Sequence, residues 1–194
     1  MNSNLGSVVP LAMFTIKIET LCFPFSGCEI EPRIHSSTSL FCPEGFPGSG
    51  NHWCHTFPAY NILSLDVDRW SGNPRKTANY WLAENKKKGR DQGFIMDLGC
   101  IRPVQGVRLR NVRNPENLDR STKKFQLLGS ASNNGPWEEL LVANLEDSRP
   151  QDPPPVVTLT FDNPSLARFV KFELLYFWGT EGGGLQYLEV LPDF

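Results

Sequence analysis

Apolar and polar residues alternate along most of the chain beyond residue 90, and this alternation predicts β-strands. Successive side chains of a strand point to opposite sides, so a strand with one buried face repeats every two residues. The pattern occurs in segments 94–98, 107–110, 158–161, 170–176 and 185–190. In each segment one alternate set is expected to face the core and the other to face away from it.

The alternation also assigns individual side chains to the two faces of a strand. Val107 and Leu109 are expected in the core, so Arg108 and Arg110 are expected to face outward. By the same rule, Glu173 is expected on the outside of the segment 170–176.

Clusters of turn-forming residues separate these segments, at 114–115, 133–136, 152–155, 162–164 and 182–184. Asparagine, aspartate, proline and glycine favour chain reversal at such points. Six to eight short strands joined in this way predict an all-β sandwich. No segment of ten or more residues shows helical periodicity, and Gly and Pro, at 16 each, are too frequent for a coiled coil.

Residues 1–55 differ from the rest, because they lack sustained periodicity and are rich in Cys, Pro, Gly and Ser. We interpret residues 1–55 as an irregular N-terminal extension and residues 56–194 as one β-domain. Whether the extension folds with the domain or is removed as a leader stays open. Residues 8–25 are apolar, but Lys17 and Glu19 interrupt them, so they match a secretory signal poorly.

Five cysteines bear on the redox compartment, at positions 22, 28, 42, 54 and 100. Four of them lie within the extension, which fits either disulfides in an oxidising compartment or reduced thiols inside a cell. Cys100 follows an apolar run and is expected to be the buried, unpaired thiol. A secreted, extracellular location is our first hypothesis, and an intracellular one is the alternative.

The overall charge excludes some classes of partner. The 194 residues carry a formal net charge of −2, which does not suit a protein that coats nucleic acid. No apolar run reaches the ~18 residues of a membrane span. Residues 75–124 nevertheless contain 13 basic and 5 acidic residues. This block either attracts sulfated glycans, anionic lipids or an acidic partner, or only keeps the surface solvated.

Several segments together resemble one family. They are Trp81, Gly93–Gly99, Val104–Val107, Lys124–Ser130, Gly135–Trp137, Ala167–Phe172 and Leu185–Val190. In this order, across about residues 60–193, they resemble a discoidin domain, also called a coagulation factor 5/8 type C domain. The resemblance implies a galactose-binding-like jelly roll, a β-sandwich of two packed antiparallel sheets. It also implies a binding module that recognises glycans, anionic phospholipid headgroups or extracellular proteins through loops at one end.

Some residues in these motifs have simple structural interpretations. Asp97 and Gly99 are expected to end a strand, because Asp bonds nearby backbone and Gly permits a positive φ. Arg168 is expected to form a structural ion pair. Trp81 and Trp137 are expected in the core or at the end of a sheet.

The resemblance places recognition in the loops that follow the first strands and in the glycine-rich loop before the last one. An aromatic face stacks on the C–H groups of a sugar, while Arg and Asn bond its hydroxyls. A buried Trp70 and a membrane-inserting loop tip are the alternatives. The candidate ligand-binding residues are Trp70, Asn73, Arg75, Arg110, Arg113, Asn114 and Trp178.

Some members of the family bind calcium near the first loop, and three residues here are candidates for that site. Asp66, Asp68 and Glu189 offer the hard oxygen ligands that Ca²⁺ prefers. The alternative interpretation is a loop turn plus a surface glutamate.

Catalysis is not expected, because no nucleophile–base pair or metal motif is found. The three histidines, His35, His52 and His55, all fall in the extension. The first hypothesis is therefore a non-catalytic extracellular binding or adhesion module for carbohydrate on a glycan or glycoprotein. The alternatives are a protein-interaction or scaffold subunit, inside or outside the cell, and a module that binds anionic phospholipids.

Overall fold

The computed structural model describes residues 31–37, 59–63, 80–83, 92–113 and 118–192. Within these residues the chain is almost entirely β, with one short 3-10 helix. The elements are β1 (Arg33–Ser37), η2 (Ala59–Leu63), β2 (Trp81–Leu82), β3 (Gly93–Asn111), β4 (Thr122–Ser130), β5 (Glu138–Asn144), β6 (Val156–Phe177) and β7 (Gly184–Pro192).

The strands form a two-layered antiparallel sandwich, as predicted. The first layer contains β1, the first half of β3, the second half of β6, β4 and β5. The second layer contains β2, β7, the second half of β3 and the first half of β6. The hydrogen-bonded order is β2-β7-β3-β6-β4-β5, with β1 beside β3.

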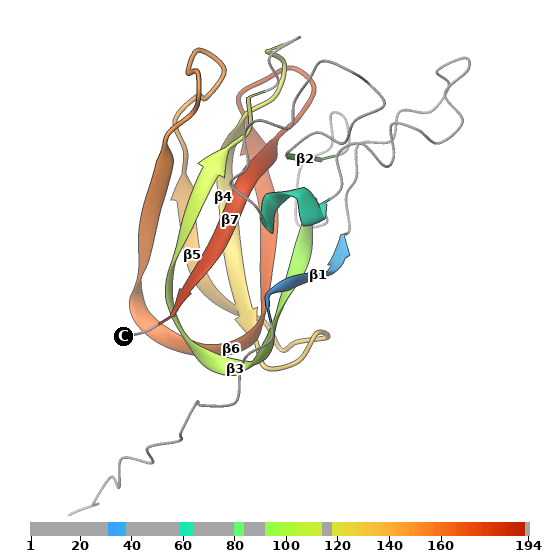
Figure 1. Cartoon of the computed structure of the whole chain (residues 1–194), viewed down its shortest axis with the longest axis vertical. Coiled ribbons are helices and arrows are strands. Elements are labelled where there is room, and N and C mark those ends of the chain that lie inside the picture. The colour runs from blue at the N-terminus through green and yellow to red at the C-terminus, as the bar shows by residue number, and fades with distance from the viewer. Residues whose placement is uncertain (1–30, 38–58, 64–79, 84–91, 114–117, 193–194) are drawn as a thin grey trace, which may run out of the picture.

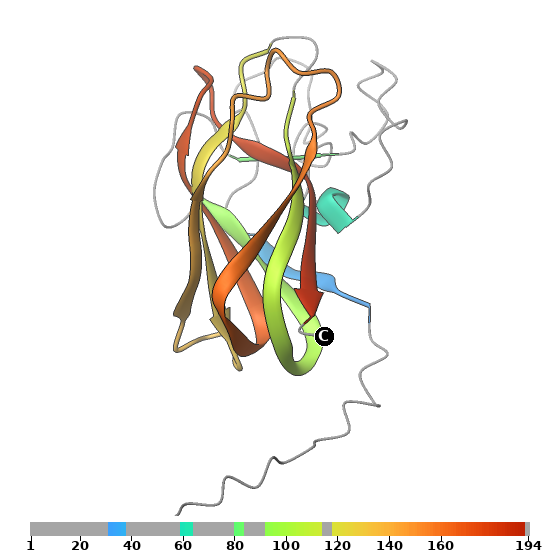
Figure 2. The ribbon, with the colours of Figure 1, turned by 90° about the vertical axis from the view of Figure 1, so that its left-hand side faces the viewer.

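The two layers are joined because β3 and β6 each run through both of them. Figures 1 and 2 show both strands curving round at one end of the sandwich, which we call the bent end. Their pairing is interrupted there, between Asp97↔Phe169 and Arg102↔Ala167. The loops after β3, β5 and β6 lie at the opposite end, which we call the loop end (Figure 1).

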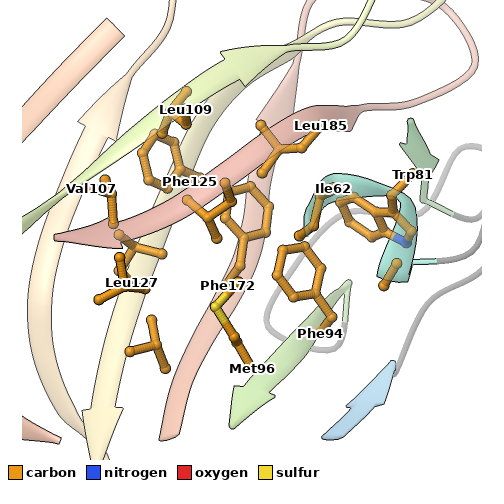
Figure 3. Packing of buried hydrophobic residues seen from close by; sticks show 14 of the residues in the cluster. Ile62, Trp81, Phe94, Met96, Val107, Leu109, Phe125, Leu127, Phe172 and Leu185 are labelled. Atoms are coloured by element: carbon orange, nitrogen blue, oxygen red, sulfur yellow. The ribbon is translucent and has the colours of Figure 1, made fainter. Parts of the chain in front are cut away.

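Aromatic side chains fill the space between the layers (Figure 3). The rings of Phe94 and Phe172 stack with centroids 5.2 Å apart, and Phe125 stacks on Phe172 at 5.1 Å. Trp81 meets Phe94 edge to face at 5.2 Å and is fully buried, as expected. Ile62 of η2 is also fully buried beside this cluster, so the helix closes the side of the sandwich between β1 and β7 (Figure 3).

The predicted faces hold along β3, where Val107 and Leu109 are fully buried and Arg108 is exposed. Glu173 faces away from the core, as predicted, but it is only 2% exposed, which the alternation does not predict. Glu173 belongs to β6, which lies between β3 and β4 in the sheet. Lys171 Nζ lies 2.5 Å from Glu173 Oε1, and the Gln126 amide donates to Glu173 Oε2, so neighbouring polar side chains pair the buried carboxylate.

An ion-pair cluster centred on Asp97 braces the bent end. Arg168 donates to Asp97 from Nε at 3.0 Å, and Arg33 of β1 donates to it from Nη2 at 3.1 Å. The Gly99 amide, in a residue with φ of 86°, donates to Asp97 Oδ1 at 2.9 Å. The Arg168 hydrogen bond leads the effects that hold the pKa of Asp97 at about 2. The structural ion pair expected for Arg168 is therefore present.

Part of the predicted extension belongs to the sheet, because β1 pairs with β3 through Arg33↔Asp97. The boundary at residue 55 lies outside the described residues, so the division into extension and domain stays a prediction. Cys100 is disulfide-bonded, which corrects the expectation that it is the unpaired thiol. The other four cysteines lie outside the described residues.

Candidate functional site

At the loop end, Trp178 is an exposed aromatic side chain, with 38% of its surface accessible. It follows directly on the last residue of β6. Its indole Nε1–H donates to the Leu145 carbonyl at 3.0 Å, and its backbone N–H donates to the Ser121 carbonyl at 2.8 Å. These two bonds hold the ring in one orientation on the surface.

A cation lies on this ring. The ammonium of Lys123 is 4.1 Å from the centre of the Trp178 ring. The Leu145 amide donates to the Lys123 carbonyl at 2.9 Å, so the start of β4 is tied to the same segment that holds the indole. The result is a fixed aromatic ring with a charged hydrogen-bond donor over it.

Buried polar residues hold the loops together beneath this surface. The Asn111 amide lies 3.1 Å from Ser121 Oγ, 2.9 Å from the Thr122 carbonyl and 3.1 Å from the Glu146 carbonyl. Its oxygen accepts from the amides of Val112 and Thr122. Asn111 thus joins the ends of β3, β4 and β5, and a network with each group satisfied is rigid.

Ser148 continues this network into the loop after β5. Its hydroxyl is 2.8 Å from Ser121 Oγ and also bonds the Val112 carbonyl, while its amide donates to Ser121 Oγ at 3.1 Å. Ser148 and Ser121 are both fully buried. The loop that contacts Trp178 is therefore anchored from below by the loop after β3.

Arg113 reaches the same loop from another side. Its Nε donates to the Arg149 carbonyl at 3.4 Å, and its Nη1 lies 3.2 Å from Asp152 Oδ2. Arg113 and Trp178, two of the predicted ligand-binding residues, are thus brought to one loop, residues 145–152. Arg113 has protein partners there, which favours a bracing role over direct recognition.

Arg110 lies elsewhere, on the outer face of the second layer, opposite Tyr187 of β7. Its Nε is buried and has no hydrogen-bond partner among the described residues. The same face holds an ion pair between Arg108 and Glu189 at 3.4 Å, and the Tyr187 hydroxyl donates to Glu189 at 2.9 Å. Burial, reinforced by this bond to Glu189, raises the pKa of Tyr187 to about 12.

The remaining predicted residues lie outside the described part of the chain. They are Trp70, Asn73, Arg75 and Asn114 of the ligand site, and Asp66 and Asp68 of the calcium site. Glu189 is described, and it is engaged by Arg108 and Tyr187. Among the described residues no group of three His, Cys, Asp or Glu is placed to hold a metal ion. The calcium site stays a prediction.

Sequence reasoning missed Lys123 and the network of Asn111, Ser121 and Ser148. Lys123 was counted only as one charge within the basic block. A buried Asn directly after a period-two segment was the one available signal, because strand alternation ends at Asn111. Apart from the Val112 amide next to Asn111, the partners of these residues are 10 to 55 positions away in the chain, so no local pattern reports them.

A small cavity of about 170 Å³ opens next to this network. It lies between the end of β5 and the second layer. Its lining includes Leu109, Asn111, Leu145, Pro154 and Val157. The cavity is mostly apolar and smaller than an ordinary ligand pocket, so the exposed surface at Trp178 is the better candidate for recognition.

Comparison with known families gives one match, over residues 47–190, to the family described as the F5/8 type C domain. No curated protein matches the chain. No helix in the described part of the chain has the length and hydrophobicity to cross a membrane.

Solved structures with a similar fold include carbohydrate-binding modules. A family 32 module from Clostridium perfringens, in complex with GalNAc-beta-1,3-galactose, has a TM-score of 0.51 and 17% identity, covering 83% of this chain and 94% of its own. The family 32 module of Streptococcus pneumoniae EndoD has a TM-score of 0.50 and 13% identity, covering 84% and 96%. A mutant chitosan-binding module from Paenibacillus sp. IK-5 has a TM-score of 0.50 and 15% identity, covering 80% and 98%. At these identities the likeness shows the fold alone.

Proposed function

The chain belongs to the F5/8 type C domain family, and from this premise we propose that it is a non-catalytic carbohydrate-binding module whose ligand contacts the loop end at Trp178. A single observation carries the proposal: the indole of Trp178 is exposed, yet hydrogen bonds from the indole N–H and from the backbone N–H of Trp178 hold it in place. A preorganised aromatic face loses little conformational entropy when a sugar ring stacks on it.

Neighbouring groups supply the polar part of recognition. The Lys123 ammonium has three donors for sugar hydroxyls and lies 4.1 Å from the ring centre. The predicted residues Trp70, Asn73, Arg75 and Asn114 lie outside the described residues and remain part of the proposed site. Arg110, whose buried Nε lacks a partner among the described residues, lies on the outer face of the second layer and is proposed as a donor at a separate part of the site.

Solved neighbours support the choice of carbohydrate as ligand. One is a complex with a disaccharide, and another is named as a chitosan-binding module. The disulfide at Cys100 supports a secreted protein, because disulfides persist in oxidising compartments. We extend the proposal to a role in adhesion, in which the module binds carbohydrate at a cell surface.

The test is a broad glycan array, probed with the full chain in the presence of calcium and again with a chelator. The affinity of each hit is then measured by calorimetry for the wild-type chain and two variants. Trp178→Ala is expected to weaken binding at least about tenfold, because it removes a stacking surface. Tyr60→Ala is the matched control, since Tyr60 is an exposed aromatic on η2 (56% exposed), away from the loop end.

Two outcomes would contradict the proposal. One is a chain that binds no glycan on the array under either condition. The other is a hit whose affinity is equally unaffected by both substitutions, which would place the ligand away from Trp178. A hit that is lost only with the chelator would instead support the calcium site at Asp66, Asp68 and Glu189.

A further inference from the structure

A second surface lies on the side of the sandwich opposite to η2, toward the bent end. It is a groove of about 560 Å³ between β5 and the bend of β6. It is more than three times the volume of the cavity at the loop end. Its walls are Glu138–Val142 on one side and Asp162–Ser165 on the other.

Two open strand edges flank this side of the sandwich. In the described part of the chain, β5 pairs only with β4 and is the last strand of the hydrogen-bonded order. Among the described residues, the first half of β6 pairs only with β3. An edge strand presents unpaired N–H and C=O groups that accept another strand. The seven residues of β5 offer an edge long enough for an extended peptide of similar length.

The side chains along the groove combine apolar and acidic character. Val142 is 39% exposed and Leu141 is half-buried, so an added strand would cover apolar surface. Glu138, Glu139 and Asp162 are all exposed carboxylates that line the groove. No basic residue lines it, and none of the three carboxylates forms an ion pair among the described residues.

From these observations we propose that the groove binds a basic, extended peptide segment of a partner protein, which adds to β5 as an extra antiparallel or parallel strand. The open backbone edge provides the main-chain hydrogen bonds of strand addition, and alternate side chains provide specificity. The three carboxylates select lysine- or arginine-rich segments and repel acidic ones. The surface is independent of the proposed glycan site, because it lies toward the other end of the molecule.

The experiment uses the full chain and three synthetic heptapeptides, followed by calorimetry and by amide NMR shifts. The first peptide alternates lysine with valine. The second replaces each valine by proline, which keeps the charge but cannot form a strand ladder. The third replaces each lysine by glutamate. Only the first is expected to bind, with amide shifts along β5.

Charge-reversal variants test the acidic walls. Glu138→Lys combined with Glu139→Lys is expected to weaken binding of the first peptide at least about tenfold, because attraction becomes repulsion at both positions. Glu146→Lys is the matched control, since this exposed glutamate lies in the loop after β5, at the loop end. It is expected to leave the affinity unchanged. If the double variant misfolds, Asp162→Lys tests the opposite wall.

The proposal is overturned by any of four results. The first peptide fails to bind; the proline peptide binds equally well; the charge reversals leave the affinity unchanged; or the chain is a dimer in solution through β5, so that a second copy occupies the edge. Loss of peptide binding leaves glycan binding intact, and the reverse also holds, so the two proposals fail separately.

Discussion

Replacing Asp97 by asparagine tests the ion-pair cluster at the bent end. The carboxylate is 1% exposed and accepts from Arg168, from Arg33 and from the Gly99 amide. Asparagine keeps the shape of the side chain but removes its charge. The substitution therefore isolates the electrostatic part of the interaction between β1, β3 and β6.

The expected loss follows from the pKa of Asp97. The Arg168 hydrogen bond leads the effects that lower this pKa from 3.8 to about 2, a difference that corresponds to about 2.5 kcal/mol of folding free energy. Because the folded-state pKa lies below the unfolded one, this contribution is fully present above pH ~4 and is lost as the pH falls to about 2. Asp97→Asn should therefore destabilise the protein by about 2–3 kcal/mol at pH 7 and by much less near pH 2.

Urea unfolding, followed by tryptophan fluorescence at pH 7, 4 and 2.5, measures this difference. Asp162→Asn is the control, because Asp162 is exposed at the bend of β6 and should leave stability within about 0.5 kcal/mol of wild type. Equal stability of Asp97→Asn and wild type at pH 7 would refute the reasoning. So would a loss of the same size at every pH, since that would be a packing effect.

Three further substitutions test the core and the loop end. Asn111→Ala should cost about 2–3 kcal/mol in urea unfolding, because it removes the hydrogen bonds to the buried Thr122 carbonyl and from the Val112 and Thr122 amides. Unchanged stability would mean that water replaces the amide. Phe172→Ala should cost about 3–5 kcal/mol, because this ring stacks on two others in the core; a loss under 1 kcal/mol would contradict the packing described. Gly179→Ala should lower the melting temperature, since an added Cβ would lie 1.7 Å from the Asp119 carbonyl oxygen. Thr180→Ala, at the neighbouring exposed position, should leave the melting temperature unchanged. Equal melting temperatures of the two variants would show that the loop moves to accommodate the methyl group.

Much of the fold could be predicted from local patterns. Alternation assigned Val107 and Leu109 to the core and Arg108 to the surface, and the structure agrees. Gly99 has the expected positive φ and its amide donates to Asp97, because both effects depend on residues close in sequence. The expectation that a strand ends there was wrong, since β3 continues to Asn111 and only its pairing with β6 is interrupted at this point. The family resemblance was confirmed over residues 47–190.

Other features could not be predicted, because they depend on neighbours that lie far apart in the chain. Period-two alternation says which way a side chain points but not what surrounds it, so it does not predict the burial of Glu173 or its pairing with Lys171 and Gln126. The partner of Cys100 is likewise a tertiary matter, and the expectation of a free thiol there was wrong.

Some features of the candidate site likewise follow from local sequence patterns, whereas others depend on tertiary contacts. The sequence by itself determined that a tryptophan lies in a glycine-rich loop before the last strand, since turn residues and strand alternation are local properties. Only the tertiary structure decided that Trp178 is held by Leu145, 33 positions away, with Lys123 on its ring. The open edge of β5 also exists only in the folded chain, because strand order is set by pairings between distant segments. Local preference thus determines which residues form strands, whereas packing of the two layers determines which surfaces are rigid, charged and open to a ligand.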